Sequence, residues 1–281
     1  MKIKAHAKLN FYLEILGKRP DGFHNLRSIM QQIRLHDVLV FHQSNQDQFI
    51  SRNRPMKQNN LVVRAAQQLK QAIDFPPVRV ELNKQIPVGA GLGGGSSDAA
   101  ATIVGLNRFF SLGLSNHDLK QIGSTLGSDV PFFIDSRAAL VEGTGVDITP
   151  VSPIDVPHIL LARPKGKIST VDVYRTLQPS DYDCTGEFDL FTKSWNNGIL
   201  GPCFNHLEAP AFRLDSRVSH LKEQMQQTKP LDCIMTGSGN VVFAVYRSRT
   251  ELEAARQEIS RYAQWIRATS TIKEYNDKSN S

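Results

Sequence analysis

The stretch Pro87-Val-Gly-Ala-Gly-Leu-Gly-Gly-Gly-Ser-Ser-Asp98 determines how the rest of this chain is interpreted. Five of the seven residues 89–95 are glycine, so few side chains keep the backbone from wrapping closely around a ligand. Alternating residues 78–82 predict a strand before it, and residues 96–98 open an alanine-rich helix that extends to about Phe110. Because backbone N–H groups converge at such a helix N-terminus, the stretch predicts a phosphate-binding loop.

Three other kinds of segment share this composition. A Gly/Ser linker does not usually stand between a strand and an apolar helix. The spacing Gly89-x-Gly91-x-x-Gly94 satisfies the dinucleotide fingerprint, but there the first glycine ends a buried strand directly, whereas here residues 83–87 intervene. These two interpretations are disfavoured but stay open. The Walker P-loop is excluded, because the lysine that must follow its second glycine is missing from this loop.

Composition is that of an ordinary soluble globular protein. The chain has 281 residues, of which 40% are hydrophobic and 21% charged, and no apolar run reaches the length of a membrane span. Its N-terminus lacks the apolar segment of a secretion signal. Cys184, Cys203 and Cys233 are odd in number and widely spaced, which indicates neither a disulfide framework nor a zinc site. We expect a cytoplasmic protein that makes no membrane contact.

The charge balance points weakly toward anionic partners. There are 33 Lys+Arg against 27 Asp+Glu, for a net charge of +6. This excess is compatible with nucleic acid, an anionic membrane or an anionic small molecule. No run of five or more Lys/Arg occurs, so a nucleic-acid binder is disfavoured, and the weak excess decides little else.

Two more helices are predicted in the first half of the chain. Residues 61–73 carry apolar side chains on one helical face behind the cap candidates Asn59 and Asn60. Ser115 and Asp118 form a capping-box pattern at the start of the other helix.

A cluster of prolines indicates a connection between two domains. Pro150, Pro153 and Pro157 fall within eight residues. We therefore expect an N-terminal domain of residues 1–152 and a C-terminal domain of residues 153–281.

The C-terminal domain is expected to be α+β. Its predicted strands cover residues 158–162, 231–235, 241–246 and 265–268. Thr250 and Glu253 form the capping box of the helix before the last strand. The order β-α-β-β-α-β is ferredoxin-like, with an insertion around residues 180–213. Residues 272–281 are polar and are assigned no role.

The glycine stretch resembles the phosphate-binding loop of the galactokinase, homoserine kinase, mevalonate kinase and phosphomevalonate kinase (GHMP) superfamily. Residues 7–13, and residues 17–26 with their Asp-Gly-aromatic-His element, are similar to the branch that phosphorylates 4-diphosphocytidyl-2-C-methyl-D-erythritol. Residues 60–66, 126–133 and 236–239 are similar as well, so the resemblance covers nearly the whole chain. It implies a two-domain α+β fold with a ribosomal-protein-S5-like N-terminal domain and a ferredoxin-like C-terminal domain.

The resemblance also implies roles for individual residues. It implies ATP-dependent phosphorylation of the substrate's 2-hydroxyl, in non-mevalonate isoprenoid precursor biosynthesis, by direct in-line transfer with Mg²⁺ as cofactor. Asp129 would be the base, and Lys8 would keep it ionised and offset charge on the phosphoryl group. The implied ATP-binding residues are Asn60, Pro87, Val88, Gly89, Ala90, Gly91, Leu92, Gly93, Gly94, Gly95, Ser96 and Ser97.

The substrate's cytidine end would meet aromatic side chains. By resemblance, Phe23 and Tyr174 would stack on the two faces of cytosine while His24 bonds its edge, and Asn10 would bond the erythritol end. Stacking of this kind contributes about 1–3 kcal/mol. Taken alone, each of these residues is more typical of a core or a turn, so their functional weight rests on the matched context.

Two departures from the superfamily pattern affect the metal site and one loop. Thr144 stands where arginine is more usual, and the acidic Mg²⁺ ligand of other superfamily kinases has no obvious match. The metal ligands are therefore left open, as is the choice between monomer and homodimer.

Three rival functions are kept. A kinase acting on homoserine or a mevalonate would need no cytosine-binding residues. An RNA-binding protein would need an aromatic strand pattern that the predicted strands lack. A nicotinamide dehydrogenase would transfer hydride and release no ADP.

Overall fold

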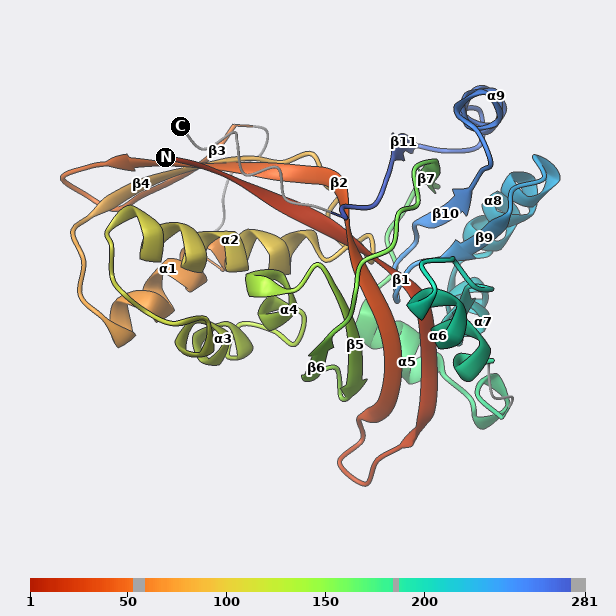
Figure 1. The fold of residues 1–281 in the computed structure, drawn as a ribbon, viewed down its shortest axis with the longest axis horizontal. Helices are drawn as coiled ribbons and strands as arrows, with labels where there is room; N and C mark the ends of the chain where they lie inside the picture. The colour runs from red at the N-terminus through yellow and green to blue at the C-terminus, as the bar shows by residue number, and fades with distance from the viewer. Residues whose placement is uncertain (53–58, 184–186, 274–281) are drawn as a thin grey trace.

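The computed structural model describes residues 1–52, 59–183 and 187–273. Within these residues the strands form one sheet of seven and one of four, with helices packed on each (Figure 1). This confirms the predicted α+β class. Cys184 and most of the polar tail lie outside the described residues, and Cys203 and Cys233 are free thiols. No helix in the described ranges is both long and apolar enough to cross a membrane.

The larger sheet is built around a long antiparallel hairpin. Its strands are β1 (Lys2–Lys18), β2 (His24–Gln43), β3 (Gln48–Ser51), β4 (Val78–Asn83), β5 (Ala138–Gly143), β6 (Asp147–Pro150) and β8 (Phe204–Asn205). The order is β3-β4-β2-β1-β8, and β5 and β6 extend the sheet from the other half of β2. Because β2 has 20 residues, it pairs with β4 along one half and with β5 along the other.

Four helices lie on one face of this sheet in Figure 1: α1 (Leu61–Ala72), α2 (Gly94–Phe109), α3 (Asn116–Ser124) and α4 (Val130–Asp135). The predicted caps of two of them are confirmed. Asn60 accepts a hydrogen bond from the N–H of Val62, and Ser115 forms a capping box with Asp118. The apolar faces of these helices bury a core against β2 and β4.

The smaller sheet has the ferredoxin-like arrangement that the sequence predicted. Its strands are β7 (Ile159–Arg163), β9 (Asp232–Met235), β10 (Val242–Val245) and β11 (Trp265–Thr269), in the antiparallel order β11-β7-β10-β9. The helices that accompany it are α5 (Thr170–Thr176), a 3₁₀ turn (Pro179–Asp181), α6 (Phe188–Asn196), α7 (Glu208–Leu214), α8 (Ser216–Gln227) and α9 (Arg249–Ile259). Of these, α6 and α7 belong to the predicted insertion.

Two predicted helix starts were wrong. Helix α2 begins at Gly94 rather than Ser96, because Gly93 adopts a left-handed conformation that leads directly into the first turn. Helix α9 is capped by Ser248, whose side chain accepts from the N–H of Glu251, and not by Thr250 with Glu253. Ser248 and Thr250 are both hydroxyl residues that can cap a helix, so the local pattern alone does not choose between them.

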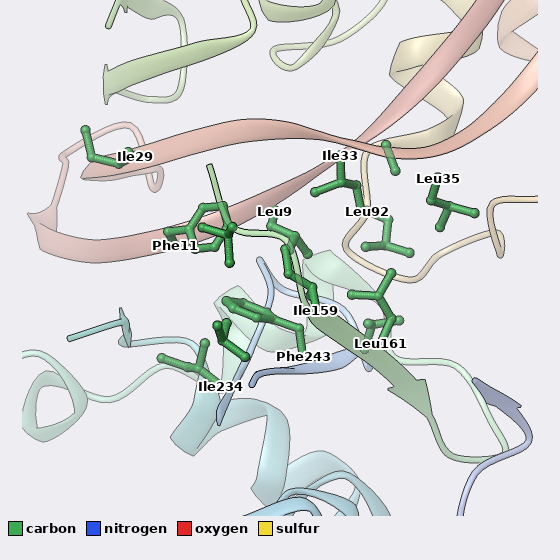
Figure 2. Close-up of a cluster of buried hydrophobic side chains, with 14 of the residues drawn as sticks. Leu9, Phe11, Ile29, Ile33, Leu35, Leu92, Ile159, Leu161, Ile234 and Phe243 are labelled. Atoms are coloured by element: carbon green, nitrogen blue, oxygen red, sulfur yellow. The ribbon is translucent and has the colours of Figure 1, made fainter. Parts of the chain in front are cut away.

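The two sheets share a hydrophobic core, shown in Figure 2. Leu9 and Phe11 of β1 pack toward Ile159 of β7 and Phe243 of β10. The rings of Phe11 and Phe243 meet edge to face with centroids 5.4 Å apart. This core holds the hairpin against the ferredoxin-like sheet and so sets the cleft between them.

The chain also crosses between the sheets outside this core. Strand β8 pairs with β1, and Thr271 forms a bridge with Ile33 after the last strand of the smaller sheet. We propose to keep the boundary between residues 1–152 and 153–281, with these segments as links.

A half-buried histidine on the hairpin should make stability depend on pH. His6 lies opposite His36 with ring centroids 5.1 Å apart. Burial, and then the neighbouring His36, lower the pKa of His6 from 6.5 to about 4. Between these values the unfolded chain binds a proton that the folded chain does not, so stability should fall as pH falls.

We expect His6→Asn to remove most of this loss. The asparagine Nδ2 takes the place of His6 Nδ1 and can still donate to the Ile33 carbonyl, which lies 3.1 Å from that nitrogen. Relative to the wild type, the variant should gain about 2–3 kcal/mol between pH 6.5 and pH 4, since one pKa unit corresponds to about 1.4 kcal/mol. Urea unfolding at several pH values measures this, and parallel stability curves for the two proteins would contradict it.

Candidate active site

A cleft of about 1250 Å³ lies between the two sheets. Its walls come from β1, the glycine loop, the turn before α4, helix α5 and the turn after β9. Every residue that the sequence nominated for catalysis or binding lines this cleft except Ser97. Ser97 lies in the first turn of α2 with 2% exposure, and because the helix starts two residues earlier than predicted, its side chain faces the interior.

The glycine loop and the first turn of α2 have the backbone geometry of an anion-binding site. Gly89, Gly91 and Gly93 all have positive φ, between 65° and 76°, where other residues would be strained. No side chain caps the first turn of α2, and the first helical bond runs from the N–H of Ser97 to Gly93. The preceding N–H groups and the positive end of the helix dipole are therefore available for an anion.

A second glycine turn, residues 236–239, reaches this loop from the smaller sheet. A Cβ added to Gly239 would lie 2.2 Å from the Ala90 carbonyl carbon and the Gly91 nitrogen. A Cβ on Gly91 would lie 2.3 Å from the Thr236 carbonyl oxygen. Since real Cβ atoms do not approach so closely, glycine is required on both sides of this contact.

A buried charge cluster anchors the start of the glycine loop. Asp37 is fully buried and accepts from the N–H groups of Gln85 and Ile86. The Lys84 ammonium donates to Asp37 at 2.5 Å and to Asp98 at 2.8 Å. Burial raises the pKa of Asp98 to about 8, and the charge of Asp37 adds to this, although Lys84 opposes it.

The Lys8 ammonium lies at the junction of the two glycine turns. It is buried and donates to Asn10 Oδ1, while a Cβ placed on Gly237 would lie 3.3 Å from its Nζ. Burial lowers the pKa of Lys8, and the charge of Asp129 opposes that shift. Asn10 itself is oriented by Ser28, to which its Nδ2 donates at 2.8 Å.

Asp129 lies at the N-terminus of α4 and is half-buried. Within the described ranges its carboxylate makes neither a hydrogen bond nor the direct ion pair with Lys8 that the resemblance implied. The Lys8 ammonium donates to Asn10 instead, because Lys8 and Asn10 lie two residues apart on β1 and their side chains therefore point to the same face of the sheet. The carboxylate is therefore open toward the cleft, within electrostatic reach of Lys8.

The far end of the cleft is aromatic. The rings of His24 and Tyr174 are 5.7 Å apart, and Phe23 is 65% exposed beside them. Burial, and then Lys18, lower the pKa of His24, while burial raises the pKa of Tyr174 and Asp129 adds to that rise. The structure thus brings all three predicted cytosine-binding residues to one end of the cleft.

Sequence reasoning missed three polar residues that shape the cleft. Lys84 and Asp37 anchor the glycine loop, and Asn205 holds the second glycine turn. Lys84 precedes the loop by three residues, and that proximity was a usable signal. Asp37 and Asn205 lie far away in the chain, and only strand pairing brings them to the site.

The class of protein that this fold and cleft define is the GHMP kinases. A family model described as the GHMP kinases N terminal domain matches residues 60–137. The structure also resembles the Methanococcus jannaschii mevalonate kinase, with a TM-score of 0.69 over 97% of this chain and 98% of that chain. At 11% identity this likeness concerns the fold alone.

Two closer matches narrow the class to one family. The 4-diphosphocytidyl-2-C-methyl-D-erythritol kinase of Alkaliphilus oremlandii is 37% identical over 268 residues, 92% of each chain. A solved 4-(cytidine 5'-diphospho)-2C-methyl-D-erythritol kinase structure aligns with a TM-score of 0.85 and 30% identity, over 96% of this chain and 99% of that chain. The chain belongs to the 4-diphosphocytidyl-2-C-methyl-D-erythritol kinase family and is a phosphotransferase with an alcohol acceptor.

We expect Gly239→Ala to separate the two glycine turns. The added Cβ meets backbone that cannot rotate away, so stability should fall by about 1–3 kcal/mol. A small displacement of the phosphate loop should also lower kcat/KM for ATP by roughly 10- to 100-fold. Thermal melting and steady-state kinetics on the folded protein measure the two effects.

The matched control is Gly198→Ala, just after α6. Gly198 also has positive φ, at 76°, but no atom lies within 4 Å of an added Cβ. This variant should lose about 1 kcal/mol of stability through backbone strain and keep its kcat/KM. Equal kinetics in the two folded variants would count against a role for the contact in catalysis.

Proposed function

We propose that this chain transfers the γ-phosphoryl group of ATP to the 2-hydroxyl of 4-diphosphocytidyl-2-C-methyl-D-erythritol, in the non-mevalonate route to isoprenoid precursors. The observation that carries this proposal is the convergence, in one cleft, of the glycine loop, Lys8, Asp129 and the aromatic end around His24. The named relatives support the choice of substrate. The absence of a membrane-spanning helix in the described ranges is compatible with action in the cytoplasm.

The ATP phosphates would bind the glycine loop and the open N-terminus of α2. Asn60, at the start of α1, lines the same end of the cleft and would meet the adenine edge. Lys84 lies before the loop, not in it, and its ammonium is bonded to Asp37 and Asp98. Its role would therefore be to hold the loop in place.

Mg²⁺ would accompany ATP. Among the described residues no group of three or more His, Cys, Asp or Glu side chains could hold a metal. The cleft nevertheless offers Ser96 and Asp129 as oxygen donors, which suits an ion held mainly by phosphates and water. When bound, Mg²⁺ would neutralise charge between the β- and γ-phosphates.

In the chemical step the substrate's 2-hydroxyl oxygen attacks the γ-phosphorus while the bond to the β,γ-bridging oxygen breaks, which releases ADP. Asp129 accepts the hydroxyl proton, a role supported by its open carboxylate. Lys8 supplies fixed positive charge beside the transferring group, and the neighbouring phosphates and Asp129 favour its protonated form. Direct transfer needs no phosphoenzyme.

The cytidine end would be recognised by stacking and by the edge of His24. Phe23 is exposed in the ligand-free chain, and Tyr174 is half-buried against His24. Cytosine would cover the exposed ring of Phe23. Burial of aromatic surface in this way would favour a pyrimidine substrate over homoserine or mevalonate, which have no ring to stack.

We expect Asp129→Asn to lower kcat by roughly 10²- to 10⁴-fold, because the hydroxyl proton loses its acceptor. ADP release and product mass, measured with MgATP and the cytidyl substrate, test this directly. The control is Asp135→Asn on the same helix, where the carboxylate pairs with Lys120 outside the cleft. If the folded wild type shows no turnover, the substrate assignment fails.

We expect His24→Ala to raise KM for the cytidyl substrate by about 10- to 100-fold and to leave KM for ATP unchanged, given 1–3 kcal/mol for a base contact. His117→Ala, on the exposed surface of α3, is the control. Unchanged KM in His24→Ala, together with ADP release on another small alcohol, would favour the rival kinase.

A further inference from the structure

The strongest unassigned feature near the cleft is a single asparagine in the insertion. Asn205 lies in β8, which runs parallel to β1 and pairs at Tyr12 and Leu13 (β1, α6 and α7 are labelled in Figure 1). It is 6% exposed and does not line the cleft. Its side chain can therefore act on the site only through another residue.

The amide of Asn205 is fully used. Its Nδ2 donates to the Met235 carbonyl at 2.7 Å and to the Gly237 carbonyl at 2.9 Å. Its Oδ1 accepts from the N–H of Leu207 at 2.9 Å. Both amide hydrogens and one oxygen lone pair thus bond to backbone groups. Of the two carbonyls, that of Gly237 lies in the second glycine turn, and that of Met235 ends β9 just before the turn.

The same turn meets the catalytic groups on its other side. The N–H of Asn10 donates to Thr236 Oγ1 at 3.0 Å, so β1 also holds the turn. A Cβ built on Gly237 would lie 3.2 Å from Asn10 Oδ1 and 3.3 Å from Lys8 Nζ. A movement of Gly237 would therefore displace the Lys8 ammonium and the Asn10 amide to which it donates.

The direction of one peptide bond is what Asn205 controls. In a trans peptide the C=O and the next N–H point to opposite sides. With the Gly237 carbonyl held by Asn205, the N–H of Ser238 points away from Asn205, and Ser238 lines the cleft. If the peptide turned over, a carbonyl oxygen would replace that donor and would repel a bound phosphate.

We propose that Asn205 is a positioning residue for phosphoryl transfer, which holds the Gly237–Ser238 peptide so that its donor faces the cleft and its carbonyl does not. This inference rests on the proposed use of Lys8 and of the glycine turns in the reaction. Glycine at 237, with φ of 58°, gives the peptide the freedom to turn, so an external bond is needed to hold it.

The test is Asn205→Asp. The aspartate keeps the side-chain shape and the acceptor for the Leu207 N–H, but it places a carboxylate oxygen beside the Met235 and Gly237 carbonyl oxygens, which repel it. At pH 8 we expect kcat to fall 10- to 100-fold, with KM for the cytidyl substrate changed less than threefold. Asn205→Ala, which removes the bonds without repulsion, should lose less. Because an aspartate buried beside carbonyls has a raised pKa, lowering the pH should restore one donor, and the kcat of Asn205→Asp relative to wild type should rise.

The matched control is Asn107→Asp at the end of α2. Asn107 also bonds the backbone through both ends of its amide: Nδ2 donates to the Leu114 carbonyl at 3.0 Å and Oδ1 accepts from the Leu114 N–H at 3.1 Å, outside the cleft. It should lower the melting temperature and leave kcat and its pH profile unchanged. The inference is overturned if folded Asn205→Asp and Asn205→Ala keep kcat within twofold of wild type. If Asn205→Asp does not fold, Asn205→Ala decides alone.

A second measurement separates this inference from the proposed function. The backbone amide NMR signals of Gly237 and Ser238, recorded without substrate, need no turnover. Asn205→Asp should shift or broaden both signals, because the peptide between them is no longer held in one orientation, and Asn107→Asp should leave them unchanged. Unchanged signals in Asn205→Asp overturn the inference even in an active kinase, whereas a wild type with no turnover but the expected signal changes contradicts only the proposed function.

Discussion

The backbone contact between the two glycine turns is the constraint on which the cleft depends. The segment around Ala90 and Gly91 belongs to the larger sheet's domain, and Gly239 follows β9, an edge strand of the smaller sheet. They approach so closely that a Cβ on Gly239 would lie 2.2 Å from backbone atoms. Such an approach positions one loop by the other without any side chain between them, so the shared core in Figure 2 and the hydrogen bonds of Asn10 and Asn205 all act to keep it in register.

The site also contains two groups of buried charged side chains, one at Lys8 and one at Lys84. Lys8 loses solvation, and its pKa falls, unless an anion is near; Asp129 supplies part of that compensation and a phosphate would supply the rest. Beneath the loop, two carboxylates share the Lys84 ammonium, and burial raises the pKa of Asp98. Both arrangements are costly in an isolated fold, and both lie where a polyanion would bind.

Local pattern was sufficient wherever an element is decided by its own residues. The caps at Asn60 and Ser115 were predicted because a side chain bonds to a backbone group two or three residues away. The ferredoxin-like order followed from the alternation of strand and helix patterns. The starts of α2 and α9 were predicted wrongly. The left-handed conformation of Gly93 and the use of Ser248 rather than Thr250 as the cap are not distinguished by the local residue pattern.

By itself the sequence determined the fold class and predicted the phosphate-type loop, since glycine spacing and helix capping are local properties of the chain. The other cleft residues that it nominated came from the resemblance to a known family. Tertiary structure alone decided that Ser97 faces inward, that Asn10 rather than Asp129 bonds Lys8, and that Asp37 and Asn205 belong to the site. The physical reason is that strand pairing and the meeting of two sheets join residues as far apart in the chain as Asn10 and Thr236, 226 positions, and no local pattern carries that information.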